Sequence, residues 1–401
     1  MGKMLIVGGG IGGLATALAC ARNGAQVDLF ERAGAFSEVG AGIQLGPNVM
    51  RVLHGWGLSD AIAQVAAFPQ RLQVRSAMSG GVLGALRLDD TFTQSYGAPY
   101  ATIHRADIHA LLVQALQAYP QVELNLGCPV FDFVQRESEV ALQIRTDRQV
   151  QGDMLIGADG GWSVIRQQLL HDGTPSPTGH LAYRAMVLQA DLPARLRSQQ
   201  VTAWLGPRMH VVQYPVRGGQ WLNVVAIVHG RVKGDMSHWD HSANAHDLQR
   251  VMAGTCVPLK DLIHSITHWR LWPLSIRPPM SGPQQHARGR VALLGDAAHP
   301  MVPYLAQGAA MAIEDADVLS RVLLEGGAWG ESPGDVPTLL QQFAQQRWQR
   351  NARVQARAIR NGRIFHATGF VRWGRDVAMR LLGQGLLDMP WLYGKSKSAT
   401  K

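Results

Sequence analysis

A glycine-rich turn near the start of the chain limits the possible fold more than any other feature. The pattern G-x-G-x-x-G occupies Gly8, Gly10 and Gly13. It follows an apolar run at residues 3–7, and the Ala- and Leu-rich residues 14–23 after it have helical character. A strand, a glycine turn and a helix, with a second strand at residues 26–30, predict a βαβ unit. Such a unit binds the pyrophosphate of a dinucleotide at the amino end of its helix.

Three acidic residues extend this site. Glu31 closes the second strand, where a carboxylate accepts hydrogen bonds from a ribose diol, so FAD or NAD is favoured over NADP. Asp159 opens the motif D-G-G-W-S-V-I-R, and Asp296 lies in G-D-A-A-H-P, each after an apolar strand. Either Asp alone is equally well a helix N-cap. At the carboxyl edge of a sheet, each can instead hold a polyol such as the ribityl chain of a flavin.

The remaining chain divides between this nucleotide-binding body and a second domain rich in β-strands. Alternating runs at residues 209–216 and 221–228, separated by R-G-G-Q, predict antiparallel strands. We expect an α/β fold in which a Rossmann-like FAD-binding domain is interleaved with a mixed or antiparallel β-sheet substrate domain and followed by C-terminal helices. The expected boundaries are 1–72, 101–175 and 281–328 for the FAD-binding domain, 73–100 and 176–280 for the substrate domain, and 329–401 for the C-terminal helices.

Composition disfavours several classes of protein. The net charge of +9 comes from scattered arginines without a Lys/Arg block, so we expect attraction of small anions and no nucleic-acid partner. Cys20, Cys128 and Cys256 lie far apart without metal-ligand spacing, so we expect neither disulfides nor a metal site, and a reducing cytoplasm fits. No apolar run approaches the roughly 18–20 residues that a membrane span requires.

The motifs in this order, with Arg105 in T-I-H-R-A-D, resemble the single-component aromatic-ring hydroxylases of the para-hydroxybenzoate hydroxylase type over nearly the whole chain. Residues 39–48, 213–219 and 299–316 look like those of 3-hydroxybenzoate 6-hydroxylases, with 6-hydroxynicotinate monooxygenases and salicylate hydroxylases as near relatives. The resemblance implies bound FAD, with NADH or NADPH, molecular oxygen and a small phenolic acid as substrates, and it allows a homodimer.

The resemblance also implies roles for individual residues. Glu31 binds the adenosine ribose, Arg105 contacts the cofactor and Asp296 binds the ribityl chain. Gly308 and Ala309 begin a helix whose amino end faces the flavin pyrimidine, where negative charge develops on reduction; simple helix-entry geometry is the alternative for Gly308. The full set of expected cofactor-binding residues is Gly8, Gly10, Gly13, Glu31, Arg32, Arg105, Val130, Asp159, Asp296, Pro300, Gly308 and Ala309.

His210 and Tyr214 are the candidate catalytic residues. They lie four apart on an alternating stretch, so they share one strand face, with Cα atoms about 13 Å apart. A lone histidine on a strand is more often structural, but the resemblance implies that this pair lines the substrate site. We expect His210 to remove the phenolic proton, since an ordinary histidine pKa near 6.5 suits a base, and Tyr214 to bind the acid. Further expected substrate-binding residues are Gln44, Val201, Val212 and Pro303.

The chain departs from both groups of relatives. Gln44 stands where the hydroxynicotinate enzymes have His, and Val201 where they have Cys, which disfavours 6-hydroxynicotinate. An Asp near Ser76 and a Gln at Pro303, expected of 3-hydroxybenzoate enzymes, are absent, so the ring substitution pattern stays open. Two other functions remain as alternatives: a flavoprotein of the same fold that does not hydroxylate, and a non-catalytic flavin-binding protein.

Overall fold

The computed structural model describes residues 2–36, 41–145, 148–230, 241–242, 244–329 and 334–394. The first two residues of the 39–48 motif therefore lie outside the described residues. The chain forms two compact units. Unit 1 comprises Met1–Val39, Ala106–Ser176 and Ile276–Ala358, and unit 2 comprises Gly40–Arg105, Pro177–Ser275 and Ile359–Lys401. The finer six-part division expected from the sequence stays a prediction.

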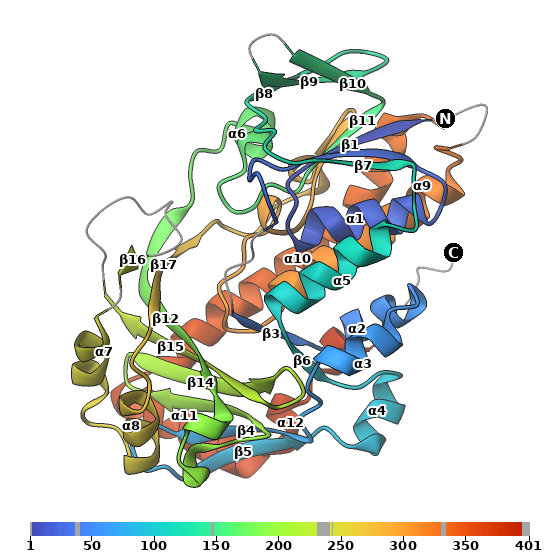
Figure 1. The fold of residues 1–401 in the computed structure, drawn as a ribbon. Helices are drawn as coiled ribbons and strands as arrows, with labels where there is room; N and C mark the ends of the chain where they lie inside the picture. The colour runs from blue at the N-terminus through green and yellow to red at the C-terminus, as the bar shows by residue number, and fades with distance from the viewer. Residues whose placement is uncertain are drawn as a thin grey trace. The chain divides into compact units, whose positions relative to one another are not determined.

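Unit 1 is built on a six-stranded sheet in the order β18-β19-β11-β1-β2-β7. Figure 1 labels β11, β1 and β7 of this sheet. Neighbours pair in parallel except β18 with β19. The strands are β1 (Lys3–Val7), β2 (Gln26–Phe30), β7 (Val122–Asn125), β11 (Met154–Gly157), β18 (Ala287–Arg288) and β19 (Val291–Leu293). Three antiparallel strands form a smaller sheet: β8 (Asp132–Gln135), β9 (Val140–Arg145) and β10 (Arg148–Gly152).

The predicted βαβ unit is confirmed. Strands β1 and β2 occupy the predicted residues, and the central residues of β1 are fully buried, as expected of a parallel strand covered on both faces. Helix α1 (Ile11–Ala21) begins three residues earlier than predicted, directly after the extended Gly10. It packs against α9 (Gly308–Glu325), where Ser320 Oγ donates a hydrogen bond to Ala19 O (3.0 Å). The other unit 1 helices are α5 (Arg105–Leu116), α6 (Val164–Leu170) and most of α10 (Val336–Phe365).

Unit 2 contains an eight-stranded sheet in the order β16-β17-β12-β15-β14-β13-β4-β5. Strands β12 to β15 pair in antiparallel fashion, as predicted, and β13 pairs in parallel with β4. The strands are β4 (Arg71–Ser76), β5 (Val82–Arg87), β12 (Ser176–Leu188), β13 (Val201–Gly206), β14 (Met209–Val216), β15 (Trp221–His229), β16 (His241–Ser242) and β17 (Arg270–Ile276). A separate pair joins β3 (Gly42–Leu45) and β6 (Ala101–His104).

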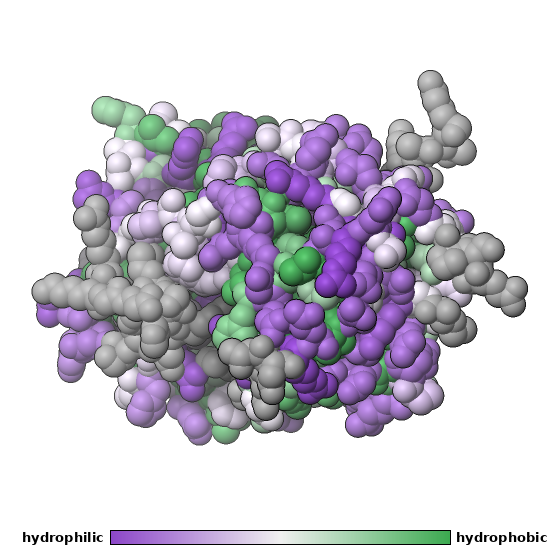
Figure 2. All heavy atoms as spheres, turned by 90° about the horizontal axis from the view of Figure 1, so that it is seen from above, coloured by the Kyte–Doolittle hydropathy of each residue, from purple (hydrophilic) through white to green (hydrophobic). Residues whose placement is uncertain are grey.

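The helices of unit 2 include short elements and the predicted C-terminal helices. They are α2 (Pro47–Gly55), α3 (Ser59–Val65), α4 (Asp90–Tyr96), α7 (Ala245–Met252), α8 (Val257–His264), α11 (Gly369–Leu382), α12 (Gln384–Leu387) and α13 (Pro390–Tyr393). None of the helices described is both long and apolar enough to cross a bilayer. The face of the molecule in Figure 2 is mostly hydrophilic, with smaller groups of apolar residues between the polar ones.

The two faces of the large sheet differ in character. One face carries apolar side chains such as Trp204, Val211 and Val224, which pack with Leu259 and Ile263 of α8 in a buried core. The opposite face of the same strands carries polar groups among the apolar ones. Because residues alternate between faces, this arrangement fixes which side chains of β12, β14 and β15 are available for a site.

Candidate active site

The glycine turn of unit 1 has the geometry of a dinucleotide-binding loop. Gly8 has a φ of 111°, and a Cβ placed on it would lie 2.3 Å from Ala158 O. A Cβ on Gly13 would lie 1.9 Å from Gly8 O, so the close packing of helix on strand requires glycine there. At Gly10, in contrast, no atom lies within 4 Å of an added Cβ. Two glycines thus serve the turn, and the third leaves the backbone open to a phosphate group.

The Glu31 carboxylate lies beside this turn because two backbone amides hold it. Its Oε2 accepts a hydrogen bond from Gly9 N (2.7 Å), and its Oε1 accepts one from Ala33 N (2.9 Å). A carboxylate has about four acceptor positions, so both oxygens can still bind a ribose diol. Of the other residues expected to bind cofactor here, Arg32 is exposed and Val130 packs against the edge of the unit 1 core.

Asp159 combines both roles that the sequence left open. Its Oδ2 accepts hydrogen bonds from Val164 N (2.8 Å) and Ile165 N (3.3 Å) at the start of α6, as a capping residue does. Its Oδ1 is buried and has no hydrogen-bond partner among the described residues, and burial raises the pKa of the carboxyl. A buried carboxylate oxygen without a partner indicates that a ligand supplies the missing donor.

Asp296 lies in the 3-10 turn Gly295–Ala297, beside the amino end of α9: its Oδ1 is 3.9 Å from the position of a Cβ on Gly308. Arg166 fixes this turn, because its Nη1 donates to Ala297 O (3.1 Å). A Cβ on Gly161 would lie 3.7 Å from Pro300 Cβ, so the two Asp motifs are neighbours in unit 1. Ala309 follows Gly308 in α9, and Pro303 is partly buried in the loop before it.

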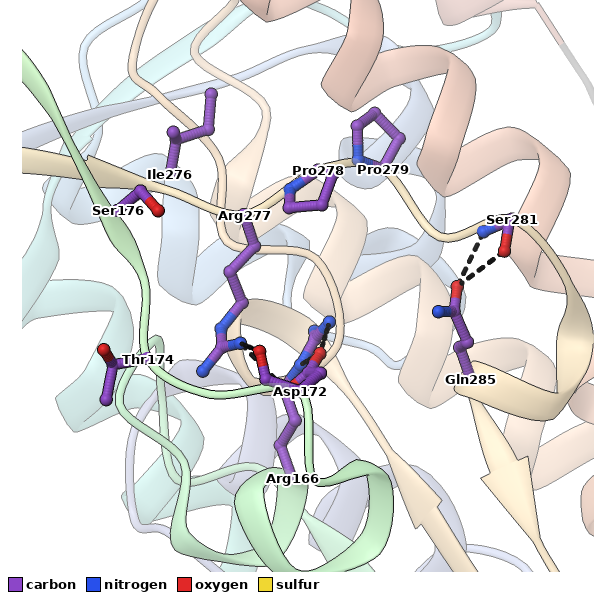
Figure 3. Close-up of a pocket in the computed structure, with 10 residues that line it drawn as sticks. All are labelled: Arg166, Asp172, Thr174, Ser176, Ile276, Arg277, Pro278, Pro279, Ser281 and Gln285. Carbon is purple, nitrogen blue, oxygen red and sulfur yellow. Dashed lines mark hydrogen bonds and ion pairs between the residues drawn. The ribbon is translucent and has the colours of Figure 1, made fainter.

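A polar pocket of about 360 Å³ in unit 1 adjoins this arrangement (Figure 3). Asp172 lies between two guanidinium groups, with its Oδ2 2.7 Å from Arg166 Nη2 and its Oδ1 2.9 Å from Arg277 Nη1. Burial raises the pKa of Asp172, but the hydrogen bonds and charges of the two arginines outweigh it and lower the pKa. Since these charges pair with one another, we assign a structural role to Asp172, Arg166 and Arg277. They hold the segments that carry Asp159 and Asp296 in place.

In unit 2, β14 presents His210, Val212 and Tyr214 on one face, and the intervening Val211 lies in the core on the other. His210 and Tyr214 therefore lie on the same face of the strand, as the alternating sequence pattern predicted. Tyr214 Oη donates to Gly42 O (2.6 Å), and Gln44 Oε1 accepts from Tyr100 Oη (2.6 Å). Strand β3, which contains Gly42 and Gln44, therefore contacts both tyrosines. Burial raises the pKa of Tyr214. Its hydroxyl proton is therefore engaged by the backbone of its own unit.

The pKa of His210 differs from the value expected from the sequence. The side chain is buried, and its Nδ1 lies 2.7 Å from Nε2 of His366. Burial, with a smaller effect of His180, lowers the pKa of His210 to about 3, so the ordinary value of 6.5 assumed from the sequence does not hold. The imidazole is neutral at working pH, and it is a weaker base than expected but an intact hydrogen-bonding group.

Arg184 of β12 is a candidate that sequence reasoning missed. It pairs with Val225, which pairs with Val212, so it lies on the His210–Tyr214 face two strands away. Its guanidinium lies 4.6 Å from the ring centroid of Trp272, and its Nε is buried without a hydrogen-bond partner among the described residues. Burial lowers its pKa. The available signal was a single Arg within the apolar run L-A-Y-R-A-M-V-L.

The remaining expected residues also lie in unit 2. Val201 begins β13 and is buried, whereas Val212 is partly buried. Arg105 begins α5, its backbone N donates to Ala41 O (2.8 Å), and its charge acts on Arg184. The cofactor-binding set is thus in unit 1 apart from Arg105, and the substrate-binding set is in unit 2 apart from Pro303.

Known proteins resemble this chain over almost its whole length. Residues 2–358 match the family model of the FAD binding domain. A 3-hydroxybenzoate 6-hydroxylase of Klebsiella oxytoca is 36% identical over 98% of this chain and 96% of its own, and a 6-hydroxynicotinate 3-monooxygenase of Pseudomonas fluorescens is 32% identical over 99% and 98%. A salicylate hydroxylase solved as a substrate complex has a TM-score of 0.81 at 26% identity, covering 98% and 95%.

The chain therefore belongs to the family of the FAD binding domain and is a flavoprotein monooxygenase of the aromatic-ring-hydroxylating class. Its cofactor is FAD, as predicted. The residues present fit that cofactor: the backbone at Gly10 is open to a pyrophosphate, and Asp159 keeps one buried oxygen for a ligand. The fold class is confirmed by the same relatives and by solved FAD hydroxylases.

Proposed function

We propose that this enzyme hydroxylates a small phenolic carboxylic acid, with 3-hydroxybenzoate, giving gentisate, as the first candidate substrate. The observation that carries this proposal is the buried Arg184 Nε without a partner on the His210–Tyr214 face. Arg184 as a whole is half-buried, but its Nε lies out of solvent, and a buried donor of a charged group is costly without an acceptor, so a carboxylate ligand is the expected complement. The relatives named for 3-hydroxybenzoate support the same substrate.

In this proposal the residues of unit 2 bind and orient the ring. Arg184 binds the carboxylate, and its planar fork suits a bidentate contact. His210, neutral and held by His366, hydrogen-bonds the phenolic oxygen and orients the ring. The ring is lined by Tyr214, Val212 and Val201. Gln44 lies on β3, the strand whose Gly42 carbonyl accepts the hydrogen bond of Tyr214. Bound FAD, reduced by NADH or NADPH, supplies the activated oxygen.

In unit 1, Glu31 and Asp296 would bind the ribose and ribityl hydroxyls, and the amino end of α9 at Gly308 and Ala309 would stabilise the negative charge on the reduced flavin. Arg105 and Pro303 remain proposed contacts to cofactor and substrate. A homodimer and a cytoplasmic location also belong to the proposal. The three cysteines support the location, since all are free.

Three alternatives remain. Salicylate and 6-hydroxynicotinate are also anionic ring compounds, and proteins named for each are similar to this chain. Gln44 and Val201 disfavour 6-hydroxynicotinate, as noted from the sequence. An oxidoreductase that does not hydroxylate is the alternative of a different class.

The test compares acids with uncharged analogues of the same shape. Purified FAD-loaded enzyme is given 3-hydroxybenzoate, salicylate, 6-hydroxynicotinate and the neutral 3-hydroxybenzyl alcohol, and NAD(P)H oxidation, oxygen uptake and product are measured together. We expect coupled hydroxylation of 3-hydroxybenzoate and little response to the alcohol. Stimulation by the alcohol alone would contradict the anionic substrate, and reductant use without any hydroxylated product would favour a non-hydroxylating flavoprotein.

A further inference from the structure

Three histidines of unit 2 bring their ring nitrogens together, and we call them the histidine cluster: His180, His229 and His366. One ligand atom from each lies within 4.8 Å of the others. His229 Nε2 is 3.1 Å from His366 Nδ1, and the His180 ring centroid is 4.5 Å from that of His229 and 4.7 Å from that of His366. The proposed hydroxylation assigns these residues no contact with the substrate.

Two members of the cluster are placed by the sheet. His180 of β12 and His229 of β15 are direct partners in the antiparallel register, so their side chains emerge side by side on one face. Two imidazoles on a rigid strand pair are held without ordering a loop. His180 is half-buried and His229 is exposed, so an ion can reach them from solvent.

The third member is fixed by backbone contacts just after α10. His366 O accepts a hydrogen bond from Arg208 N (3.1 Å), and Arg375 donates to the carbonyl oxygens of Ile364 (3.1 Å) and Phe365 (2.7 Å). The His366 Nε2 contact with His210 Nδ1 (2.7 Å) orients the ring, which leaves Nδ1 facing His229. A metal-binding histidine usually has such an outer partner on its second nitrogen.

The charges around the cluster permit a cation. Arg375 is paired with Asp376 (2.7 Å), and Arg208 is exposed, where water screens its charge.

We propose that the histidine cluster binds one divalent transition-metal ion of the zinc type through three imidazole nitrogens, with a fourth position open to water. Imidazole ligands suit zinc, copper and nickel, whereas calcium and magnesium prefer oxygen. Nitrogens bound tetrahedrally at about 2.0–2.1 Å lie about 3.3–3.4 Å from one another. The His229–His366 pair at 3.1 Å is already close to that spacing, and the His180 nitrogen, within 4.8 Å of both, would move toward them. This site does not depend on the proposed substrate.

A second group, His286, His299 and Asp315 of unit 1, is a weaker candidate. The Asp315 carboxylate is already engaged by His299 Nε2 (2.6 Å), Arg347 Nε (2.7 Å) and Asn351 Nδ2 (2.9 Å). A metal there would displace the ion pair with Arg347, so these residues are better explained as a buried network that fixes α10 against α9.

The experiment uses FAD-loaded enzyme made without a polyhistidine tag and cleared of metal with a chelator. Zn²⁺ alone is titrated calorimetrically, and retained zinc is counted by mass spectrometry. We expect one Zn²⁺ per chain, and at least a 10- to 100-fold weaker affinity in His229→Ala and in His180→Ala. X-ray absorption at the zinc edge should give nitrogen neighbours at about 2.0–2.1 Å with imidazole scattering.

The matched control is His268→Ala, an exposed histidine of the same unit outside the cluster, which should bind zinc as the wild type does. His229 is exposed, so its variant should keep the fold, and the retained flavin absorbance checks this. The proposal is overturned if the wild type shows no saturable zinc binding or if His229→Ala binds zinc as tightly as the wild type. If zinc binding is lost in His286→Ala and kept in the variants of the histidine cluster, the ion lies in unit 1 and the proposal is also rejected.

Discussion

Unit 1 holds its glycine turn and Glu31 within one local βαβ segment, whereas unit 2 brings Arg184 of β12 to the same sheet face as His210 and Tyr214 of β14. In unit 1 the backbone itself is the binding surface, so the required residues follow one another in sequence. In unit 2 the surface exists only after β12, β15 and β14 have paired in the correct register. A site formed by one continuous segment can be recognised in the sequence as a motif. A site formed by paired strands cannot be recognised as a motif, because its residues are far apart in the chain.

Both units contain polar groups that are paired and buried polar atoms that are not. In unit 1, Glu31 is held by backbone amides and Asp172 by two arginines. On the strand face of unit 2, Arg184 Nε is buried without a partner. Groups that are already paired mainly maintain geometry, while a buried polar atom without a partner, Arg184 Nε in unit 2 or Asp159 Oδ1 in unit 1, points to a ligand.

The largest effect is expected at Gly13. In Gly13→Ala the new methyl group meets the carbonyl of Gly8, so we expect the unfolding free energy to fall by about 3–5 kcal/mol and FAD to be lost. Urea unfolding and the ratio of flavin to protein absorbance measure both. Gly10→Ala, whose methyl group enters open space, should fold normally. Equal stability of the two variants would break the argument that unit 1 is built by local backbone geometry.

The next effect concerns chemistry in unit 2. His210→Ala should lower hydroxylation about 10²-fold while NAD(P)H oxidation continues, because the phenolic oxygen loses the hydrogen-bonding partner that orients the ring. Hydrogen peroxide should then replace hydroxylated product. Peroxide release and product yield are measured against His268→Ala, which should stay coupled. Coupled turnover at the wild-type rate in the His210 variant would remove His210 from the mechanism.

Arg184→Gln separates binding from stability. A lost charged contact of about 1.5–3 kcal/mol should raise KM for 3-hydroxybenzoate roughly 10- to 100-fold, with little change for 3-hydroxybenzyl alcohol. Because the buried Nε has no partner, removing the charge should leave the unfolding free energy equal or higher. A clear loss of stability with unchanged KM would show that Arg184 is structural and that its unpartnered Nε does not mark a ligand.

The smallest effect is a pH dependence in unit 1. Burial, as the main cause, lowers the pKa of His286 to about 4. Well above pH 6.5 the imidazole is neutral in folded and unfolded chains, so it adds no pH dependence there. As the pH falls from 6.5 toward 4, the unfolded chain binds a proton that the folded chain does not, and by pH 5 this costs about 2 kcal/mol of stability.

His286→Gln should therefore flatten the decline of the urea midpoint between pH 6.5 and 5 without changing FAD binding. The wild type at the same pH values is the reference. An identical decline in both proteins would mean that this histidine is not the acid-sensitive group of the unit 1 network.

Most secondary structure near the cofactor could be predicted from the sequence, because each element is specified by its own residues. β2 and β14 occupy the predicted residues, and α1 differs only at its start. The shared face of His210 and Tyr214 also follows from a period of two. The contacts of these residues could not be predicted: the Tyr214 hydroxyl binds Gly42, 172 positions away, and His210 contacts His366, 156 positions away.

The sequence by itself determined the glycine turn, the strands and the class of cofactor, since steric limits on the backbone and side-chain periodicity act between near neighbours. Only the tertiary structure decided which groups are buried together. It lowered the pKa of His210 to about 3, placed Arg184 on the same sheet face as His210 and Tyr214, and assembled the histidine cluster from two strands and the end of a helix. These properties depend on burial and on strand register, which arise from residues far apart in the chain.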